Sequence, residues 1–195
     1  MAIKIQNVGV IGAGQMGNGI AHVCALAGYS VHLNDLSADR IKAGMATING
    51  NMARQVGKKS ISEDDRKNAL ARIKPAETYD ALSGCDLVIE TATEKEEVKR
   101  KIFSDVCGSL KPEAILATNT SSISITRLAS STDRPERFIG IHFMNPVPLM
   151  ELVELIRGIA TDDGTFESSK AFVIKLGKTI AVSEDFPAFI VNRIL

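Results

Sequence analysis

The sequence predicts an α/β fold in which a doubly wound, mostly parallel sheet carries helices on both faces. Short apolar runs rich in β-branched residues alternate with longer segments of helical periodicity along the chain. A glycine-rich turn, GAGQMG, joins the first apolar run to the first helical segment. No linker rich in proline, glycine or serine divides the 195 residues, which are enough for one large domain with its own core.

Most of the predicted strands are apolar runs, as expected for strands that are buried on both faces of a parallel sheet. Two of these runs, DLVIE and AILAT, end directly before polar residues. The predicted strands are residues 5–11, 30–34, 86–90, 114–118, 138–143, 152–156 and 179–182.

Start and stop signals mark the predicted helices. Gly28 ends the first helix, Ser37 caps the second, and the segment GKKS breaks the second helix. Ser62 and Asp65 begin a short third helix, and Pro187 is suited to the first turn of a last one. The predicted helices are residues 16–27, 37–55, a short helix from 62, 94–107, 165–176 and a helix from 187.

Composition excludes several classes of partner. Lys and Arg together number 23, as do Asp and Glu, so the net charge is zero and nothing favours nucleic acid. Cys24, Cys85 and Cys107 lack the spacing of metal ligands, which predicts reduced thiols and no metal site. Apolar runs are too short to span a membrane, and the first strand leaves no room for a signal peptide. We therefore expect a cytoplasmic chain that does not associate with membranes.

The turn GAGQMG has the spacing of a dinucleotide-binding fingerprint. Gly12 allows the tight turn out of the strand, Gly14 lets the backbone approach a pyrophosphate, and Gly17 lets the helix sit close to the sheet. The N-terminus of the following helix offers free N–H groups and a partial positive charge to phosphate. The sequence therefore predicts that the chain binds a dinucleotide.

An acidic residue at the end of the second predicted strand favours NAD over NADP. The Asp35 carboxylate accepts hydrogen bonds from ribose hydroxyls and would repel a 2′-phosphate. The next residue is Leu36, and Arg40, the nearest candidate to receive such a phosphate, lies within the following helix. The alternative is an ordinary strand–helix turn in which Asp35 caps the next helix.

A histidine and a glutamate in two successive apolar runs form a candidate catalytic pair. Glu151 and Glu154 are an odd number of residues apart, so on a strand they face opposite sides and one faces the core. A buried carboxylate needs a partner, because leaving it unpaired costs on the order of several kcal/mol. His142 is suited to that role if the two strands lie side by side, and would act as a general base on an alcohol. The alternative is a structural histidine and an edge-strand glutamate.

Other polar residues are weaker candidates. Ser121 follows the strand AILAT, where ligands bind in this fold class, although a turn or helix cap is the alternative. Asn192 is an uncharged polar residue within the apolar segment FIVNRIL and needs a partner. Arg54, Lys58 and Lys59 lie at the exit of the long helix, where they meet either the phosphates of coenzyme A or only solvent.

Four motifs in order resemble the 3-hydroxyacyl-CoA dehydrogenases, most closely those of the bacterial 3-hydroxybutyryl-CoA type. They are GAGQMGNGIA, NTSS, HFMNPVP followed by ELVELIRG, and IVNRIL. The resemblance covers essentially the whole chain. It implies a Rossmann-like, NAD-binding domain of an oxidoreductase that converts (3S)-3-hydroxyacyl-CoA to 3-oxoacyl-CoA in fatty-acid or butanoate metabolism.

The resemblance also implies roles for individual residues. His142 is the catalytic base, Glu154 is its carboxylate partner, and Ser121 and Asn192 contact the reacting oxygens. Coenzyme A is expected at Arg54 and Lys58. The residues implied for NAD are Gly12, Ala13, Gly14, Gln15, Met16 and Gly17 at the pyrophosphate, Asp35 at the adenosine ribose, Glu94 and Lys99 near the nicotinamide, and Ser121 and Asn145 beside nicotinamide and substrate.

By the same resemblance, residues 1–187 form the NAD-binding domain and residues 188–195 begin a linker helix to a C-terminal helical domain. Members of the family close the substrate cleft and form a homodimer through that domain. We therefore expect weak or no activity from this chain alone. Ala188 stands where the family usually has glycine, and is strained if the position needs positive φ.

Three other functions stay open at this stage. The chain could bind NAD without turnover, or serve as a recruited structural protein, as lens lambda-crystallin resembles this family. It could also be another oxidoreductase with a GxGxMG turn, of the 3-hydroxyisobutyrate or 6-phosphogluconate type, which depends on a catalytic lysine. Replacement of His142 by asparagine separates the 3-hydroxyacyl-CoA dehydrogenase from this last class of oxidoreductase.

Overall fold

The computed structural model describes residues 3–186 and 189–191. Its strands are β1 (Asn7–Ile11), β2 (Ser30–Asn34), β3 (Ile73–Ala76), β4 (Leu87–Glu90), β5 (Ile115–Thr118), β6 (Phe138–Phe143), β7 (Leu152–Arg157) and β8 (Thr179–Glu184). Its α-helices are α1 (Gln15–Leu26), α2 (Ala38–Gly57), α3 (Glu63–Ala71), α4 (Glu96–Cys107), α5 (Ile125–Ala129) and α6 (Asp163–Lys175). Two 3₁₀ helices, η1 (Tyr79–Leu82) and η2 (Pro135–Arg137), complete the described elements.

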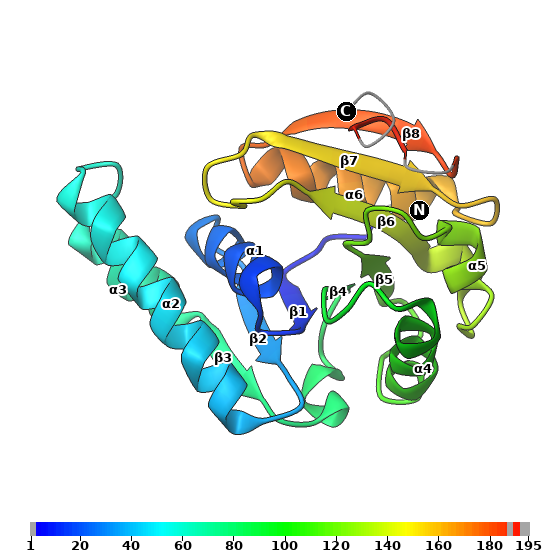
Figure 1. Cartoon of the computed structure of the whole chain (residues 1–195), viewed down its shortest axis with the longest axis horizontal. Helices are drawn as coiled ribbons and strands as arrows, with labels where there is room; N and C mark the ends of the chain where they lie inside the picture. Colours follow the sequence, from blue (N-terminus) through cyan, green and yellow to red (C-terminus); the bar gives the residue numbers. More distant parts are fainter. Residues whose placement is uncertain (1–2, 187–188, 192–195) are drawn as a thin grey trace.

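The described strands form one sheet in the order β3-β2-β1-β4-β5-β6-β7-β8 (Figure 1). The strands from β3 to β6 in that order pair in parallel, β7 is antiparallel to β6, and β8 is parallel to β7. The order reverses between β1 and β4, and in such sheets ligands bind at the carboxyl ends of the strands flanking that reversal. The predicted doubly wound, mostly parallel sheet is confirmed.

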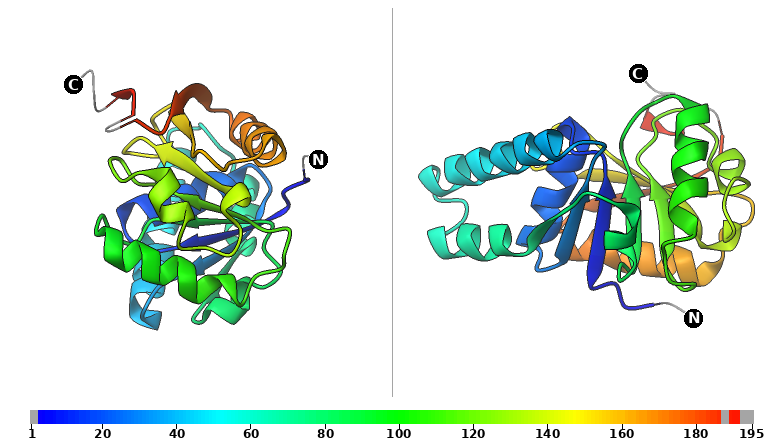
Figure 2. Two further views of the ribbon diagram at one scale, coloured as in Figure 1. Left: turned by 90° about the vertical axis from the view of Figure 1, so that its right-hand side faces the viewer. Right: turned by 90° about the horizontal axis from the view of Figure 1, so that it is seen from below.

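Two separate apolar cores cover the two faces of the sheet, because successive side chains of a strand point to opposite faces. In β4, Leu87 and Ile89 join the core beneath α1, α2 and α6, whereas Val88 joins the core beneath α4 and α5. The views in Figure 2 show these helices on opposite sides of the sheet. Burial on both faces explains why the strands are continuous apolar runs rather than alternating ones.

Helices α2 and α3 extend past the sheet as an antiparallel pair (Figures 1 and 2). Ser37 caps α2 by accepting a hydrogen bond from the Arg40 N–H, as predicted. Ser62 and Asp65 form a reciprocal capping box at the start of α3. The sequence signals for both helix starts are therefore confirmed.

Strand β3, helix α5 and the 3₁₀ helices η1 and η2 were not predicted from the sequence. Strand β3 contains Lys74 and Pro75, and a proline has no N–H to donate to a neighbouring strand. Pro75 is tolerated because β3 lies at the edge of the sheet. Helix α5 has five residues, too few for helical periodicity to be visible. The start of the predicted helix at Pro187 and the predicted strain at Ala188 both lie outside the described residues.

Cys24, Cys85 and Cys107 are free and buried, in agreement with the prediction of reduced thiols. Burial raises the pKa of the Cys85 thiol to about 12, so the thiol stays protonated and unreactive near neutral pH. Among the described residues, no helix combines the length and the apolar character needed to cross a membrane.

Candidate active site

The glycine-rich turn between β1 and α1 has the backbone geometry that its sequence predicts. Gly12 has a φ of 101°, which favours glycine, and its N–H donates to the Asn34 carbonyl at 2.8 Å. A Cβ atom on Gly17 would lie 1.7 Å from the Gly12 carbonyl oxygen, so only glycine fits there. A Cβ atom on Gly14 would meet nothing within 4 Å, so the backbone at this position is open to a ligand.

Replacement of Gly17 by alanine is expected to weaken NAD binding by about tenfold or more and to destabilise the fold by about 1–3 kcal/mol, because the added methyl overlaps the Gly12 carbonyl. Gly14→Ala is the matched control for stability, since its methyl enters open space and the variant should unfold at the wild-type temperature. Its affinity for NAD should nevertheless fall, because the methyl lies where the pyrophosphate is expected. Isothermal titration calorimetry and thermal unfolding measure both quantities. Wild-type NAD affinity in both variants would show that the pyrophosphate does not lie on this turn.

Asp35 lies next to the same turn. Its Oδ2 accepts a hydrogen bond from the Ala13 N–H at 2.8 Å and its Oδ1 accepts one from the Leu36 N–H at 2.7 Å. The Arg40 guanidinium lies 3.7 Å from Oδ1, so the cation singled out in the sequence faces the carboxylate itself. A cavity of about 270 Å³ adjoins this group, and its apolar lining includes Leu36, Val98 and Ile102. A carboxylate beside an apolar cavity suits a ribose joined to a flat base.

His142 and Glu154 face each other across the β6–β7 pair. They are register partners, and His142 Nδ1 lies 2.7 Å from Glu154 Oε2. Glu154 is fully buried, whereas Glu151, just before β7, is exposed, as the parity argument requires. An ionised carboxylate only accepts hydrogen bonds, so a neutral imidazole in this position pairs with it through an Nδ1 hydrogen and leaves the lone pair on Nε2. The sequence prediction that these two residues pair is confirmed.

Two backbone N–H groups complete the surroundings of the glutamate. Ile190 and Val191 both donate to Glu154 Oε1 at 2.9 Å. The buried carboxylate therefore receives three hydrogen bonds, including the one from His142, and these offset its loss of hydration.

A cavity of about 530 Å³ brings His142 together with several of the predicted residues. Its lining includes Met16 from the first turn of α1, Glu94 and Ser121 from the loops after β4 and β5, and Asn145 from the loop after β6. The Gln15 side chain donates to the Asn145 Oδ1 at 3.2 Å, which links that loop to the start of α1. Of the predicted catalytic and nicotinamide-side residues, His142, Glu94, Ser121 and Asn145 therefore lie together at the carboxyl ends of the parallel strands.

The Glu94 carboxylate is held by the loop after β5. Its Oε1 accepts hydrogen bonds from the Thr120 hydroxyl at 2.5 Å, the Ser121 N–H at 2.9 Å and the Ser121 and Ser122 hydroxyls at 3.2 and 3.1 Å. Burial raises the pKa of Glu94, but the hydrogen bonds outweigh it and lower the pKa below its usual value. The carboxylate therefore stays charged at the edge of the cavity.

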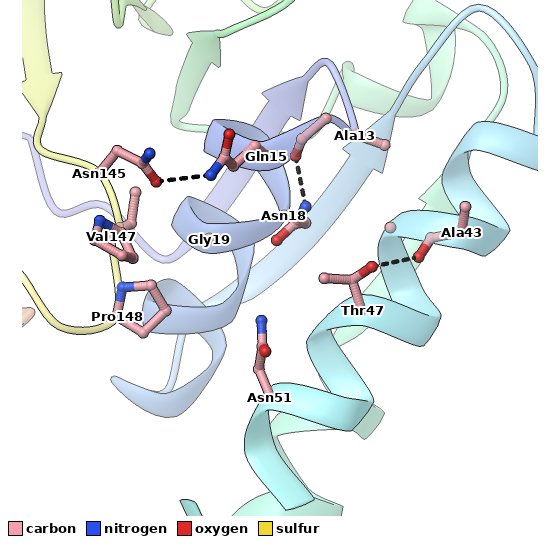
Figure 3. A pocket seen from close by; sticks show the side chains of 13 residues that line it. Ala13, Gln15, Asn18, Gly19, Ala43, Thr47, Asn51, Asn145, Val147 and Pro148 are labelled. Carbon is pink, nitrogen blue, oxygen red and sulfur yellow. Dashed lines mark hydrogen bonds between the residues drawn. The ribbon is translucent and has the colours of Figure 1, made fainter. Parts of the chain in front are cut away.

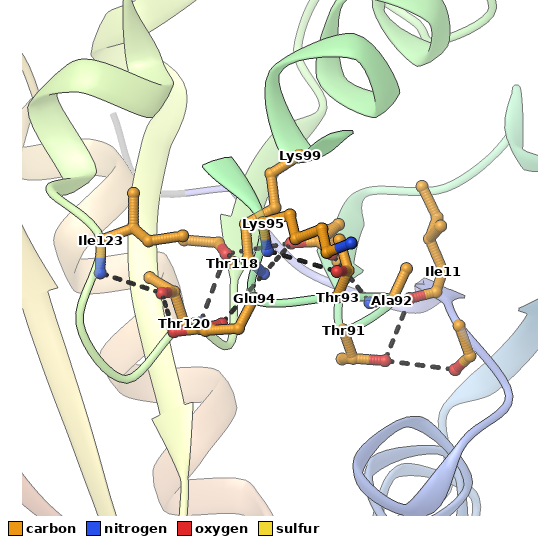
Figure 4. A network of polar contacts seen from close by, with 12 residues as sticks. Ile11, Thr91, Ala92, Thr93, Glu94, Lys95, Lys99, Thr118, Thr120 and Ile123 are labelled. Carbon is orange, nitrogen blue, oxygen red and sulfur yellow. Dashed lines mark hydrogen bonds and ion pairs between the residues drawn. The ribbon is translucent and has the colours of Figure 1, made fainter. Parts of the chain in front are cut away.

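Lys99 lies behind Glu94, within the protein. Its ammonium donates to Glu90 Oε2 at 2.5 Å and to the Thr118 hydroxyl at 3.3 Å, and lies 3.7 Å from Glu94 Oε2 (Figure 4). The Lys99 and Glu90 side chains are 1% and 0% exposed. The predicted cofactor residue Lys99 therefore acts on the cavity through Glu94 rather than by lining it.

Glu90, Thr118 and Thr120 were missed from the sequence. One signal was available for Glu90, because Lys99 has the helical spacing of the buried residues Phe103 and Val106 and so falls on the apolar face of α4. A lysine on such a face needs a buried anion.

The remaining predicted residues lie apart from His142. Arg54 belongs to the last turn of α2, where its guanidinium donates to Asn51, and Lys58 is the C-cap of α2. Asn192 lies outside the described residues. Within the described ranges, no group of three or more His, Cys, Asp or Glu residues could hold a metal ion.

A third cavity, of about 400 Å³, lies between α1, α2 and the loop after β6 (Figure 3). Amide and hydroxyl side chains line much of it, among them Asn18, Thr47, Asn51 and Asn145. Asn145 lines both this cavity and the one at His142, and Asn51 lies one helical turn before Arg54. The cavity therefore extends from the His142 region toward the basic end of α2.

Comparisons with known proteins agree on one family. The model for "3-hydroxyacyl-CoA dehydrogenase, NAD binding domain" matches residues 7–186. A 3-hydroxybutyryl-CoA dehydrogenase from Bradyrhizobium diazoefficiens is 76% identical over 195 residues, which are 100% of this chain and 67% of that protein. A fatty acid oxidation complex subunit alpha from Acinetobacter baylyi is 40% identical over 194 residues, or 27% of its own length.

A solved structure extends this likeness to the fold. The crystal structure of (S)-3-hydroxybutyryl-CoA dehydrogenase from Ralstonia eutropha superposes with a TM-score of 0.96 at 47% identity. The match covers 98% of this chain and 68% of that one.

Proposed function

Because this chain belongs to the 3-hydroxyacyl-CoA dehydrogenase family and contains its NAD-binding domain, we propose that it catalyses the reversible oxidation of a (3S)-3-hydroxyacyl-CoA. The reaction transfers the hydride from C3 to NAD, releases the hydroxyl proton to the protein and forms the 3-oxoacyl-CoA. One observation carries the proposal: the His142–Glu154 pair opens onto the cavity that also holds Glu94 and Ser121, next to the glycine-rich turn.

The described residues fit the dinucleotide. The open backbone at Gly14 and the first turn of α1 would hold the pyrophosphate, and Asp35 would hold the adenosine ribose. The charged Glu94 carboxylate, at the rim of the cavity, suits the positively charged nicotinamide end. When bound, NAD supplies the hydride acceptor.

His142 acts as the general base in this proposal. Its Nε2 takes the hydroxyl proton of the substrate while Nδ1 remains bonded to Glu154. Glu154 fixes the tautomer and stabilises the imidazolium that forms. In the reverse direction the same nitrogen returns the proton to the alkoxide.

Ser121 and Asn192 are proposed to contact the reacting oxygen, and Asn145 to lie beside nicotinamide and substrate. The support for Ser121 and Asn145 is that both line the cavity at His142. The cavity between α1, α2 and the loop after β6 would take the extended arm of coenzyme A, with Arg54 and Lys58 near its phosphates. Its amide and hydroxyl lining suits a ligand with several amide groups.

We also propose that residues 1–187 act as the NAD-binding domain and that a homodimer of the family type needs a C-terminal helical domain. The test measures NADH oxidation with acetoacetyl-CoA, and NAD binding by calorimetry, for this chain and for a version extended past Leu195. Turnover by the extended version alone would support both the reaction and the need for a second domain. Turnover by both would overturn the need for that domain. NAD binding without turnover by either would overturn the substrate assignment and favour a binding function.

A further inference from the structure

We propose that Asp185 is a positioning residue for the His142–Glu154 pair, an inference that rests on the function proposed above. The carboxylate of Glu154 contacts His142 with one oxygen and the backbone of Ile190 and Val191 with the other. The direction in which Glu154 holds the imidazole therefore depends on where the chain after β8 lies. The Asp185 carboxylate ties this part of the chain to the start of α5, which packs on the sheet.

The backbone next to Glu154 does not hold its conformation by local preference. Phe189 has a φ of 49°, in the left-handed region that residues with a Cβ atom rarely adopt. Such a conformation persists only where surrounding contacts fix it. The Phe189 ring is buried in the core beneath α4 and α5, and its centroid lies 6.3 Å from that of His142. The Phe189 N–H donates to the Phe186 carbonyl at 3.0 Å, which links it back toward Asp185.

Asp185 supplies a polar anchor for the same part of the chain. Its Oδ2 accepts hydrogen bonds from the Ser124 hydroxyl at 2.7 Å and the Thr126 N–H at 2.8 Å, and its Oδ1 accepts one from the Ile125 N–H at 2.8 Å. Burial raises the pKa of Asp185, but these donors outweigh it, and the net pKa lies below its usual value. The anchor is therefore an ionised carboxylate with three donors.

The element to which Asp185 binds is packed on both strands of the catalytic pair. Helix α5 contacts β6, which carries His142, and β7, which carries Glu154. At the contact with β6, a Cβ atom on Gly140 would lie 2.9 Å from Ile125 Cδ1, so α5 sits directly on that strand. Asp185 thus fixes the donors of Glu154 relative to the two strands that carry the pair.

The test compares Asp185→Asn with Asp162→Asn, a control that alters another aspartate capping a helix. Asp162 accepts from the Thr165 N–H at the start of α6, whereas the backbone donors of Glu154 lie in the chain after β8. In Asp185→Asn the amide group turns a donor toward an N–H or hydroxyl that needs an acceptor. We expect kcat with acetoacetyl-CoA to fall about 10–100-fold, because a small displacement of a reacting group is costly. The Kd for NAD should stay within about twofold of wild type, since the glycine turn is untouched.

Proton NMR supplies a readout that does not need turnover. The Nδ1–H of His142, assigned by its loss in His142→Asn, gives a downfield resonance that reports its hydrogen bond to Glu154. We expect this resonance to shift or broaden in Asp185→Asn and to stay in place in Asp162→Asn. An unchanged resonance in Asp185→Asn would overturn the positioning role.

The outcomes separate this inference from the proposed function. If the wild-type protein has no turnover yet the resonance moves only in Asp185→Asn, the function fails and the positioning role stands. If turnover and the resonance both stay at wild-type values, the function stands and the positioning role fails. If Asp185→Asn does not fold, Ser124→Ala removes one of the three donors. Ser124→Ala should lower kcat and shift the His142 resonance in the same way, but by less. A wild-type kcat and resonance in this variant would overturn the positioning role of Asp185.

Discussion

Replacement of His142 by asparagine is expected to lower kcat for acetoacetyl-CoA reduction by about 10²–10⁴-fold, which is the usual contribution of a positioned general acid or base. Asparagine retains a donor for Glu154 but has no nitrogen that exchanges a proton near neutral pH. The measurement is the rate of NADH consumption at saturating substrate, in whichever chain length turns over.

The affinity for NAD distinguishes a lost base from a damaged fold. The His142–Glu154 pair lies on β6 and β7, whereas the glycine turn and Asp35 lie at the ends of β1 and β2. His142→Asn should therefore bind NAD like the wild-type protein. His32→Asn is the matched control, because His32 lies in the middle of β2 and its Nδ1 is 3.8 Å from the Cys85 sulfur, on another part of the sheet than the β6–β7 pair. Full activity in His142→Asn would show that another group moves the proton.

The fold was largely predictable because most strands are buried on both faces and therefore read as apolar runs, as in β4, β5 and β6. The two strands that are partly exposed differ, because β8 was still predicted whereas β3 was missed. Strand β3 is half exposed and contains Lys74 and Pro75, so nothing in its sequence separates it from a loop. Its place in the sheet is set by pairing with β2, which is a tertiary contact.

The candidate site was predictable where side chains carry the chemistry. The parity of Glu151 and Glu154, together with the apolar surroundings of Glu154, made His142 a candidate partner, and the family resemblance favoured that pair over a structural histidine. The donors from Ile190 and Val191 were not predictable, because backbone N–H groups are the same in every sequence. Their position follows from how the chain returns to the sheet after β8.

Replacement of Lys99 by methionine is expected to lower the free energy of unfolding by about 3–5 kcal/mol, the usual cost of removing one partner of a buried ion pair. Methionine fills a similar volume, so packing alone predicts a smaller loss. The cost arises because Glu90, which is fully buried, loses the ammonium that lies 2.5 Å from its Oε2. Urea unfolding followed by circular dichroism measures the loss.

A lysine two positions along the same helix provides the control. Lys101 pairs with Asp105 at 3.0 Å, and its side chain is 76% exposed. Solvent screens such a pair, so Lys101→Met should change stability by about 0.5 kcal/mol or less. Equal losses in the two variants would show that Lys99 contributes through its alkyl chain rather than its charge.

The double variant Lys99→Met/Glu90→Gln tests whether the buried ion pair at the end of β4 serves stability or the neighbouring cavity. The amide oxygen of the introduced glutamine can accept from the Ala92 N–H, as Glu90 does at 2.8 Å, and its NH₂ group can donate to Thr118. With no unpaired charge left inside, most of the lost stability should return, since neutral replacements of buried pairs are often tolerated. If the double variant has wild-type stability but a lower affinity for NAD, the ion pair is kept for the cavity, where Lys99 lies 3.7 Å from the Glu94 carboxylate. If its stability and its NAD affinity both match those of the wild type, the ion pair serves neither property. If its stability stays as low as that of Lys99→Met, the hydrogen bonds of Lys99 are themselves required for the fold.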